Sequence, residues 1–210
     1  MATKILLIRH GSTDWNAQQR YCGFLDVELN NKGRLQARRL KKRLSVENVD
    51  KVYSSDRLRA IETAKIIFPE DVIHLVEDLK EISFGIFEGL TYKEILKKHP
   101  QNYKKWVADP FNTAIPQGES LNIFKKRVLK AFNKVSKEHA GKSIAIVCHG
   151  GVTSVLINSV LKANDFWKYV PDSASLSILE KENSKFKLSL FNDIAHLKGI
   201  KIDRVRFKEE

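Results

Sequence analysis

With 210 residues, 42% of them hydrophobic and 30% charged, the chain is expected to fold as one sizeable globular domain and not to be mainly disordered. The formal net charge of +12 attracts anions. Because the lysines and arginines are scattered and form neither a basic arm nor a known nucleic-acid motif, we expect small phosphorylated anions as partners and no nucleic acid.

Cysteine usage and hydropathy bear on the compartment. The two cysteines, Cys22 and Cys148, are too few for a disulfide framework, and neither has companions at metal-ligand spacing. The apolar run directly before Arg9 has only four residues, 5–8, which is too short for a signal peptide or a membrane span, and no other run is long enough. We therefore expect a cytoplasmic protein that does not contact a membrane.

Short apolar runs bounded by polar residues or glycine recur along the chain. Where they are rich in β-branched residues they are typical of parallel strands covered on both faces, and such strands are predicted at 5–8, 49–53 and 143–148. Two later runs, 175–180 and 186–191, are predicted to form a hairpin across residues 182–184.

Amphipathic patterns fill the intervals between these strands. Helices are predicted through residues 35–44, 58–67, 119–138 and 155–160. Asn30 or Asn31 is expected to cap the first of them. The alternation predicts the α/β class, with a three-layer α/β/α sandwich around a mostly parallel central sheet.

The segment from about residue 79 to 116 departs from this alternation. It combines short helical patterns with aromatic residues and turn signals. We predict one domain over residues 1–210, in which this segment is a lid-like insertion that roofs a site. Trp106 and Phe111 are expected to pack within it and not to face substrate. The order of the tail after Leu197 is left open.

One motif occurs twice: an apolar strand, one further residue, and then His-Gly. It places His10 and His149 at strand ends. In an α/β sheet, ligands bind outside the carboxyl ends of the strands, and glycine lets backbone N–H groups approach an anion. The pattern alone leaves open two unrelated histidines. A metal site is a weak alternative, because no third ligand lies at a recognisable spacing.

The residues around these histidines resemble one family. The blocks are Arg9-His10-Gly11-Ser12-Thr13-Asp14-Trp15-Asn16, Ser54-Ser55-Asp56-Arg57-Leu58-Arg59, Leu79-Lys80-Glu81, Gly85-Ile86-Phe87-Glu88-Gly89, Pro116-Gln117-Gly118-Glu119-Ser120 and His149-Gly150-Gly151. In this order they closely resemble the histidine phosphatase superfamily, which also contains the cofactor-dependent phosphoglycerate mutases. The resemblance runs from residue 4 to about residue 196 and implies a phosphoglycerate mutase-like fold.

The resemblance implies a role for each matching residue. His10 is the expected nucleophile, His149 stabilises the transferring group, and Glu81 is the expected proton donor. The implied phosphate pocket also contains Arg9, Asn16, Arg59 and Gly150. Arginine forks suit phosphate oxygens, and a neutral imidazole is a competent nucleophile that divides the reaction into two steps. No metal and no other cofactor is implied.

Some positions allow two interpretations. Thr13 either donates to the pocket or caps a turn. Glu88 is either a second acid or, as we favour, an orienting partner. Arg57 is expected to contribute less to phosphate binding than Arg59. Cys148 stands where the family commonly has a hydroxyl residue, which is expected to soften the hydrogen bonding behind His149.

The expected activity is hydrolysis of phosphomonoesters through a phosphohistidine, with α-ribazole 5'-phosphate among the substrates considered. The alternative is a cofactor-dependent phosphoglycerate mutase, which is disfavoured because only 26 residues separate Gly89 from Pro116, fewer than the mutases use to enclose their substrate. A non-catalytic binding protein is disfavoured because every catalytic position is filled. The expected partner is a small-molecule phosphomonoester, and a homodimer is left open.

Overall fold

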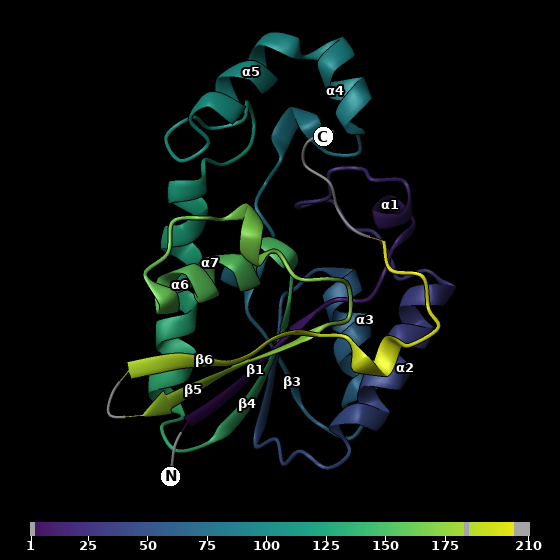
Figure 1. Ribbon diagram of the computed structural model, residues 1–210, viewed down its shortest axis with the longest axis vertical. Coiled ribbons are helices and arrows are strands. Elements are labelled where there is room, and N and C mark those ends of the chain that lie inside the picture. Colours follow the sequence, from purple (N-terminus) through teal and green to yellow (C-terminus); the bar gives the residue numbers. More distant parts are fainter. Residues whose placement is uncertain (1–2, 183–184, 204–210) are drawn as a thin grey trace.

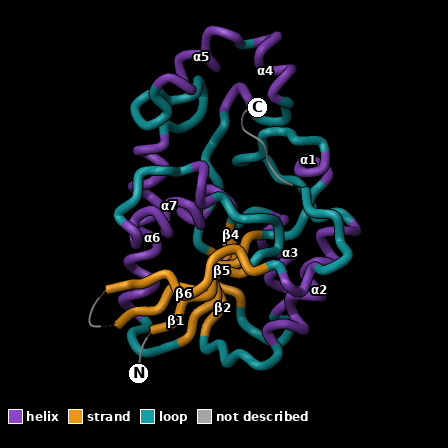
Figure 2. Tube along the Cα trace, viewed as in Figure 1, coloured by secondary structure: helices purple, strands orange, loops and turns teal. Residues whose placement is uncertain are grey.

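The computed structural model describes residues 3–182 and 185–203, and its described strands form one sheet in the order β3-β2-β4-β1-β5-β6 (Figures 1 and 2). The strands β3, β2, β4 and β1 pair in parallel, β5 pairs antiparallel with β1, and β6 pairs antiparallel with β5. The strands are β1 (Thr3–Arg9), β2 (Lys51–Ser54), β3 (Ile73–Leu75), β4 (Ser143–Cys148), β5 (Leu176–Glu182) and β6 (Lys185–Asp193). The predicted α/β class and mostly parallel sheet are confirmed.

Helices cover both faces of the sheet (Figure 1), with α2 (Asn31–Leu44) and α3 (Leu58–Ile67) on one face and α6 (Leu121–Glu138) and α7 (Gly150–Leu161) on the other. Successive side chains of a strand point to opposite faces, and in β1 Leu6 and Ile8 pack with α2 and α3, whereas Ile5 and Leu7 pack with α6 and α7. All four side chains are at most 1% exposed, which explains why this strand is continuously apolar.

Side-chain caps fix where two of these helices begin. The Asn30 side chain accepts a hydrogen bond from the Gly33 N–H at 2.9 Å, so Asn30 and not Asn31 caps α2. Ser120 caps α6 in the same way, and the helix begins two residues later than the expected residue 119. Strand β3 was not expected from the sequence, because it has only three residues, which are partly exposed.

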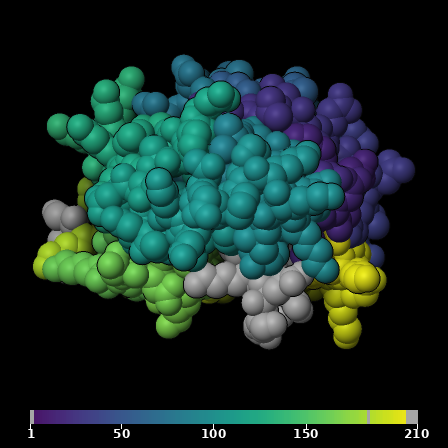
Figure 3. Space-filling view, turned by 90° about the horizontal axis from the view of Figure 1, so that it is seen from above, coloured from purple at the N-terminus to yellow at the C-terminus, as the bar shows by residue number. Residues whose placement is uncertain are grey.

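The segment between residues 79 and 116 stands above the sheet and carries α4 (Tyr92–Lys98) and α5 (Pro100–Ala108) (Figure 1). Seen from above, its teal atoms occupy the centre of the visible face (Figure 3). Trp106 is 1% exposed and packs against Phe84, Phe87 and Tyr103, so its predicted packing role is confirmed. Three 3₁₀ turns, η1 (Glu77–Leu79), η2 (Gly85–Phe87) and η3 (Trp167–Tyr169), adjoin this region and α7.

The remaining expectations concern the hairpin, the tail and membrane insertion. Strands β5 and β6 pair antiparallel up to Glu182 and Lys185, which confirms the hairpin, although two of its turn residues, 183 and 184, lie outside the described residues. The tail is described through η4 (Ala195–Leu197) to Asp203, and the rest of it lies outside. None of the helices within the described residues is long and apolar enough to span a membrane.

Candidate active site

Three neighbouring parallel strands end at the same place and deliver the first groups of the site. His10 follows β1, His149 follows β4 and Ser55 follows β2, and all three are at most 4% exposed. Sheet-like bonds continue one residue beyond the strands, since the N–H of His10 donates to the Cys148 carbonyl and that of Ser55 to the Val147 carbonyl, both at 2.9 Å. The two imidazole centroids are consequently 5.2 Å apart.

The His10 ring has a defined tautomer. Its Nδ1 lies 2.7 Å from the carbonyl oxygen of Gly11, which can only accept, so Nδ1 carries the proton and Nε2 carries a lone pair. Burial holds the pKa of His10 well below its usual range, and the charges of Arg59 and Arg9 lower it further. The ring is therefore neutral near pH 7 and presents an unprotonated nitrogen.

Two buried guanidiniums flank the histidines and are anchored by backbone carbonyls. Arg9 donates to the carbonyl of Pro171, while Arg59 donates to those of Gly23 and Leu25 at 2.7 and 3.0 Å. Each side chain still has donors to offer, because its Nε is buried without a hydrogen-bond partner among the described residues. These anchors hold two positive charges in place before any ligand binds.

His149 presents a third unpartnered nitrogen. Its Nε2 lies 2.8 Å from the hydroxyl of Ser55, and its Nδ1 is buried without a partner within the described chain. The same hydroxyl accepts the N–H of Arg57 at 3.3 Å, which leaves its proton free to point at Nε2 and so favours the proton on Nδ1. Burial, and then Arg59, hold the pKa of His149 well below its usual range.

Glu81 contacts the first turn of α7, which begins directly after His149. One carboxyl oxygen accepts the N–H of Gly151 at 2.8 Å, and the other accepts the N–H of Ile82 at 2.9 Å. Burial raises the pKa of this carboxyl, against the opposing effect of these two hydrogen bonds. A side chain on residue 151 would collide with Glu81 Oε1 at 2.2 Å, so Gly151 makes room for the carboxyl.

The structure gives Thr13 the capping role. The Thr13 side chain accepts the N–H of Asn16 at 3.2 Å, and Asn16 Oδ1 accepts the N–H of Thr13 at 3.0 Å, which is a capping box at the start of α1 (Asp14–Ala17). Because Oδ1 of Asn16 is used in the cap, the amide nitrogen is the group of this buried side chain that suits an anion.

Glu88 makes contacts of the kind expected of an orienting partner, and its role stays a prediction. Its carboxylate accepts the N–H groups of Phe24, Leu25 and Phe84 at 2.8 to 3.2 Å. The first two belong to the loop whose carbonyls receive Arg59, so Glu88 supports Arg59 through that loop. Arg57 also contacts the loop, and its guanidinium is turned to Asp56 and Asp26.

The glycines of the two His-Gly motifs allow close packing, and the predicted approach of the Gly150 N–H to an anion stays a prediction. The N–H of Gly11 donates to the Thr63 hydroxyl at 3.1 Å, and a side chain at Gly11 would meet the Gly33 carbonyl at 2.6 Å. A side chain at Gly150 would meet the Arg9 guanidinium at 3.4 Å and Val170 at 3.0 Å. Gly11 thus allows α2 to approach the loop after β1, and Gly150 allows Val170 to pack closely at the start of α7.

Sequence reasoning missed three contributors to this site. Ser55 lies in one of the six motifs that resemble the family. Its position directly after β2, the strand that pairs with β4, is the feature that could have identified it. The carbonyl of Pro171 gave no signal, because every residue has one. Arg127 donates to the Glu81 carbonyl at 2.7 Å from α6, and one basic residue among the many of that helix does not stand out.

Cys148 lies 3.6 Å from the Thr153 hydroxyl behind His149. No cluster of three or more His, Cys, Asp or Glu residues suited to a metal occurs in the described part of the chain.

Comparison with known proteins bears on this geometry. A sequence model of the histidine phosphatase superfamily, branch 1, matches residues 5–194. Phosphoglycerate mutase-like protein 4 of Arabidopsis thaliana is 37% identical over 201 residues, covering 92% of this chain and 86% of that protein. The metal-independent phosphoserine phosphatase of the same plant is 34% identical over 204 residues, covering 94% and 84%. The crystal structure of the α-ribazole phosphatase from Shigella flexneri matches with a TM-score of 0.84 at 28% identity, covering 90% of this chain and 96% of that one.

Proposed function

We propose that this chain, which belongs to the histidine phosphatase superfamily and is a phosphoric monoester hydrolase, moves the phosphoryl group of its substrate first to His10 and then to water. The observation that carries this proposal is the set of buried nitrogens without partners in the described chain: Nε of Arg9, Nε of Arg59 and Nδ1 of His149. Three such donors match the three non-bridging oxygens of a phosphoryl group beside the lone pair of His10 Nε2. Asn16 adds an amide donor, and Gly150 adds its backbone N–H at the start of α7.

In the first step, Nε2 of His10 attacks phosphorus, and the bond between phosphorus and the ester oxygen breaks. The leaving alkoxide takes its proton from Glu81, whose raised pKa keeps part of the carboxyl protonated. In the second step, the Glu81 carboxylate removes a proton from water, which attacks phosphorus and breaks the N–P bond. Inorganic phosphate leaves, and His10 and Glu81 return to their starting states.

The substrate we propose is a small monoester of an aliphatic alcohol. Such an alkoxide is a poor leaving group and needs the proton that Glu81 supplies, whereas an activated aryl ester does not. Serine and ribose both offer aliphatic hydroxyls, which fits the names of the phosphoserine and α-ribazole phosphatases among the relatives. In this proposal, the α4–α5 segment roofs the pocket.

The proposal extends to the metal requirement and the compartment of the protein. Metal independence is proposed because one relative is named for it and because the roles above need no metal. A reducing cytoplasm fits Cys22 and Cys148, which are both free. The single domain over residues 1–210 and the exclusion of nucleic acid as a partner stay predictions, and a homodimer stays an open alternative.

A panel of monoesters tests the proposed function. We expect inorganic phosphate from phosphoserine, α-ribazole 5'-phosphate or another alkyl monoester, with activity unchanged after dialysis against a chelator. Incubation with 3-phosphoglycerate, with and without 2,3-bisphosphoglycerate, should give negligible 2-phosphoglycerate. Bisphosphate-dependent isomerisation faster than any phosphate release would identify a mutase, and activity that needed an added divalent ion would contradict metal independence.

The pH dependence of kcat/KM follows from the two shifted groups. His10 acts unprotonated, so activity falls as pH drops through its pKa, which lies well below 6.5. Glu81 acts protonated, so activity falls as pH rises through its pKa, which lies above 4.5. We expect a maximum on the acid side of neutrality and loss of the alkaline limb in Glu81→Gln. A second monoester whose phosphate ionises at a different pH distinguishes the ionisation of the substrate from that of the enzyme. If the enzyme's activity fell with decreasing pH already above pH 6.5, the assignment of His10 as a buried neutral imidazole would be contradicted.

A further inference from the structure

Arg127, on α6, uses all five of its N–H donors. Its Nε and one Nη2 hydrogen bind the two carboxylate oxygens of Glu119, each at 2.8 Å. The other three donate to the carbonyls of Asp78, Lys80 and Glu81 at 3.0, 2.8 and 2.7 Å. The side chain is 15% exposed. The guanidinium therefore fixes the backbone of the turn that leads into Glu81.

Glu119 fixes the backbone on the other side of Glu81. Its Oε2 accepts the N–H of Ser83 at 2.9 Å, and its own N–H donates to the Ser83 carbonyl at 3.0 Å. At Gly118, a side chain would meet that carbonyl at 2.5 Å, so this close approach requires the glycine. The Pro116–Ser120 motif thus holds the chain immediately after Glu81, while Arg127 holds the chain before it.

We propose that Arg127, through its ion pair with Glu119, is a positioning residue that sets where the Glu81 carboxyl meets the leaving oxygen. This inference rests on the proposed role of Glu81 as the general acid. Proton transfer needs the two heavy atoms about 2.6 to 3.2 Å apart, and a displacement of about 1 Å can cost about 10²-fold in rate. The Glu81 side chain is otherwise held by backbone N–H groups alone, so the course of its own backbone decides where it points.

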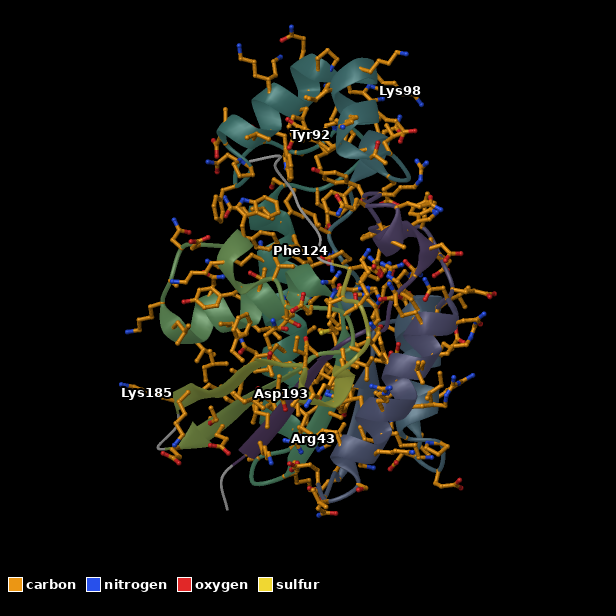
Figure 4. The ribbon with its side chains drawn as sticks, turned by 45° about the vertical axis from the view of Figure 1, so that its right-hand side comes forward. Arg43, Tyr92, Lys98, Phe124, Lys185 and Asp193 are labelled. Atoms are coloured by element: carbon orange, nitrogen blue, oxygen red, sulfur yellow. The ribbon has the colours of Figure 1, made fainter. Side chains whose placement is uncertain are left out.

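Arginine is required here by geometry as well as by charge. The guanidinium lies against Phe124, with its carbon 4.9 Å from the ring centroid, and against Phe24, 5.4 Å away on the loop that holds Arg59 (Phe124 is labelled in Figure 4). A lysine would keep one positive charge but has three donors on a single nitrogen, so it cannot reach Glu119 and three carbonyls at once. Arg127→Lys should consequently rescue activity only in part.

The test compares p-nitrophenyl phosphate, an activated aryl ester, with the best alkyl monoester of the panel. For Arg127→Ala we expect kcat/KM to fall by about 10²-fold with the alkyl ester and by no more than about 3-fold with the aryl ester. In the Glu81→Gln background, the same substitution should change either rate by less than about 3-fold, because residues that act through one group are not additive. The matched control is Arg43→Ala, which breaks a partly buried pair with Asp193 in the lower part of Figure 4 and should alter neither rate.

The outcomes separate this inference from the function on which it rests. If Glu81→Gln itself slows both esters equally, the general acid has been assigned wrongly. If Glu81→Gln shows the leaving-group dependence but Arg127→Ala slows both esters equally, or adds in full to Glu81→Gln, then Arg127 is only structural and the inference is wrong.

Folding is controlled with a second variant. Arg127→Ala leaves the carboxylate of Glu119 without its partner, which destabilises a protein more than loss of the pair does. Arg127→Met combined with Glu119→Gln removes both charges, and the amide oxygen that the second substitution introduces can still accept the Ser83 N–H. Far-UV circular dichroism and a thermal melt should show a native fold for this variant, with the same alkyl-selective loss. A folded double variant with wild-type rates on both esters would overturn the inference.

Discussion

Replacing His10 with alanine is expected to lower kcat by at least about 10³-fold, because the loss of a nucleophile leaves only the residual catalysis of the binding groups. His10 is the one imidazole of the site whose Nε2 is fixed as a lone pair by a backbone carbonyl. Rapid mixing with labelled substrate, followed by a quench that avoids acid, should trap phosphate on the wild-type protein and none on the variant. The variant should fold normally, since His10 donates its side-chain bond only to the adjacent residue.

His74→Gln is the matched control for this experiment, because it removes an imidazole from β3 that contacts the Tyr53 ring and not the site. It should keep wild-type kcat and should still trap phosphate. If His10→Ala retained near-native kcat, or if label appeared on that variant, the nucleophile would be another residue, and His149 would be the next to test.

The sequence predicted every described strand except β3, a three-residue strand at one edge of the sheet. The continuously apolar runs at β1 and β4 are visible because both faces of those strands are buried, and β6 is visible because polar and apolar residues alternate along it. Strand β3 has no comparable signal, since its three partly exposed residues become a strand only through pairing with β2. Such a strand depends on its neighbour more than on its own side chains.

In the candidate site, the sequence identified side chains in motifs but not the backbone groups that anchor them. His10, His149, Arg9 and Arg59 could be located because each lies beside a strand end or in a motif with a distinctive residue type. Their anchors could not be located, because the carbonyls of Gly23, Leu25 and Pro171 belong to backbone that remote loops bring into place. The sequence therefore predicts which groups carry the chemistry, and the structure is needed to show what holds them.

Arg59→Met is expected to lower kcat by about 10² to 10³-fold, which is typical of losing one donor that faces developing charge in a buried site. Arg59 is fully buried, two backbone carbonyls anchor its terminal nitrogens, and its Nε has no partner among the described residues. These carbonyls hold the guanidinium in place before a ligand binds. The loss should therefore appear in kcat and in the affinity for vanadate, which resembles the transferring phosphoryl group. Arg59→Lys should recover only part of both, because lysine lacks the planar fork.

Arg57→Met is the comparison that decides between the two arginines of this segment. Its guanidinium lies 2.9 Å from the Asp56 carboxylate and 3.4 Å from that of Asp26, and Asp56 raises its pKa, as expected of an arginine in an ion pair. Its loss should loosen the loop that carries Phe24 and cost only about 3-fold in kcat, since a partly exposed ion pair contributes little. Arg59→Met also leaves the carbonyls of Gly23 and Leu25 without their donor, so a thermal melt must accompany both variants. An equal loss of vanadate affinity in the two folded variants would mean that Arg59 supports the loop and does not bind the phosphoryl group.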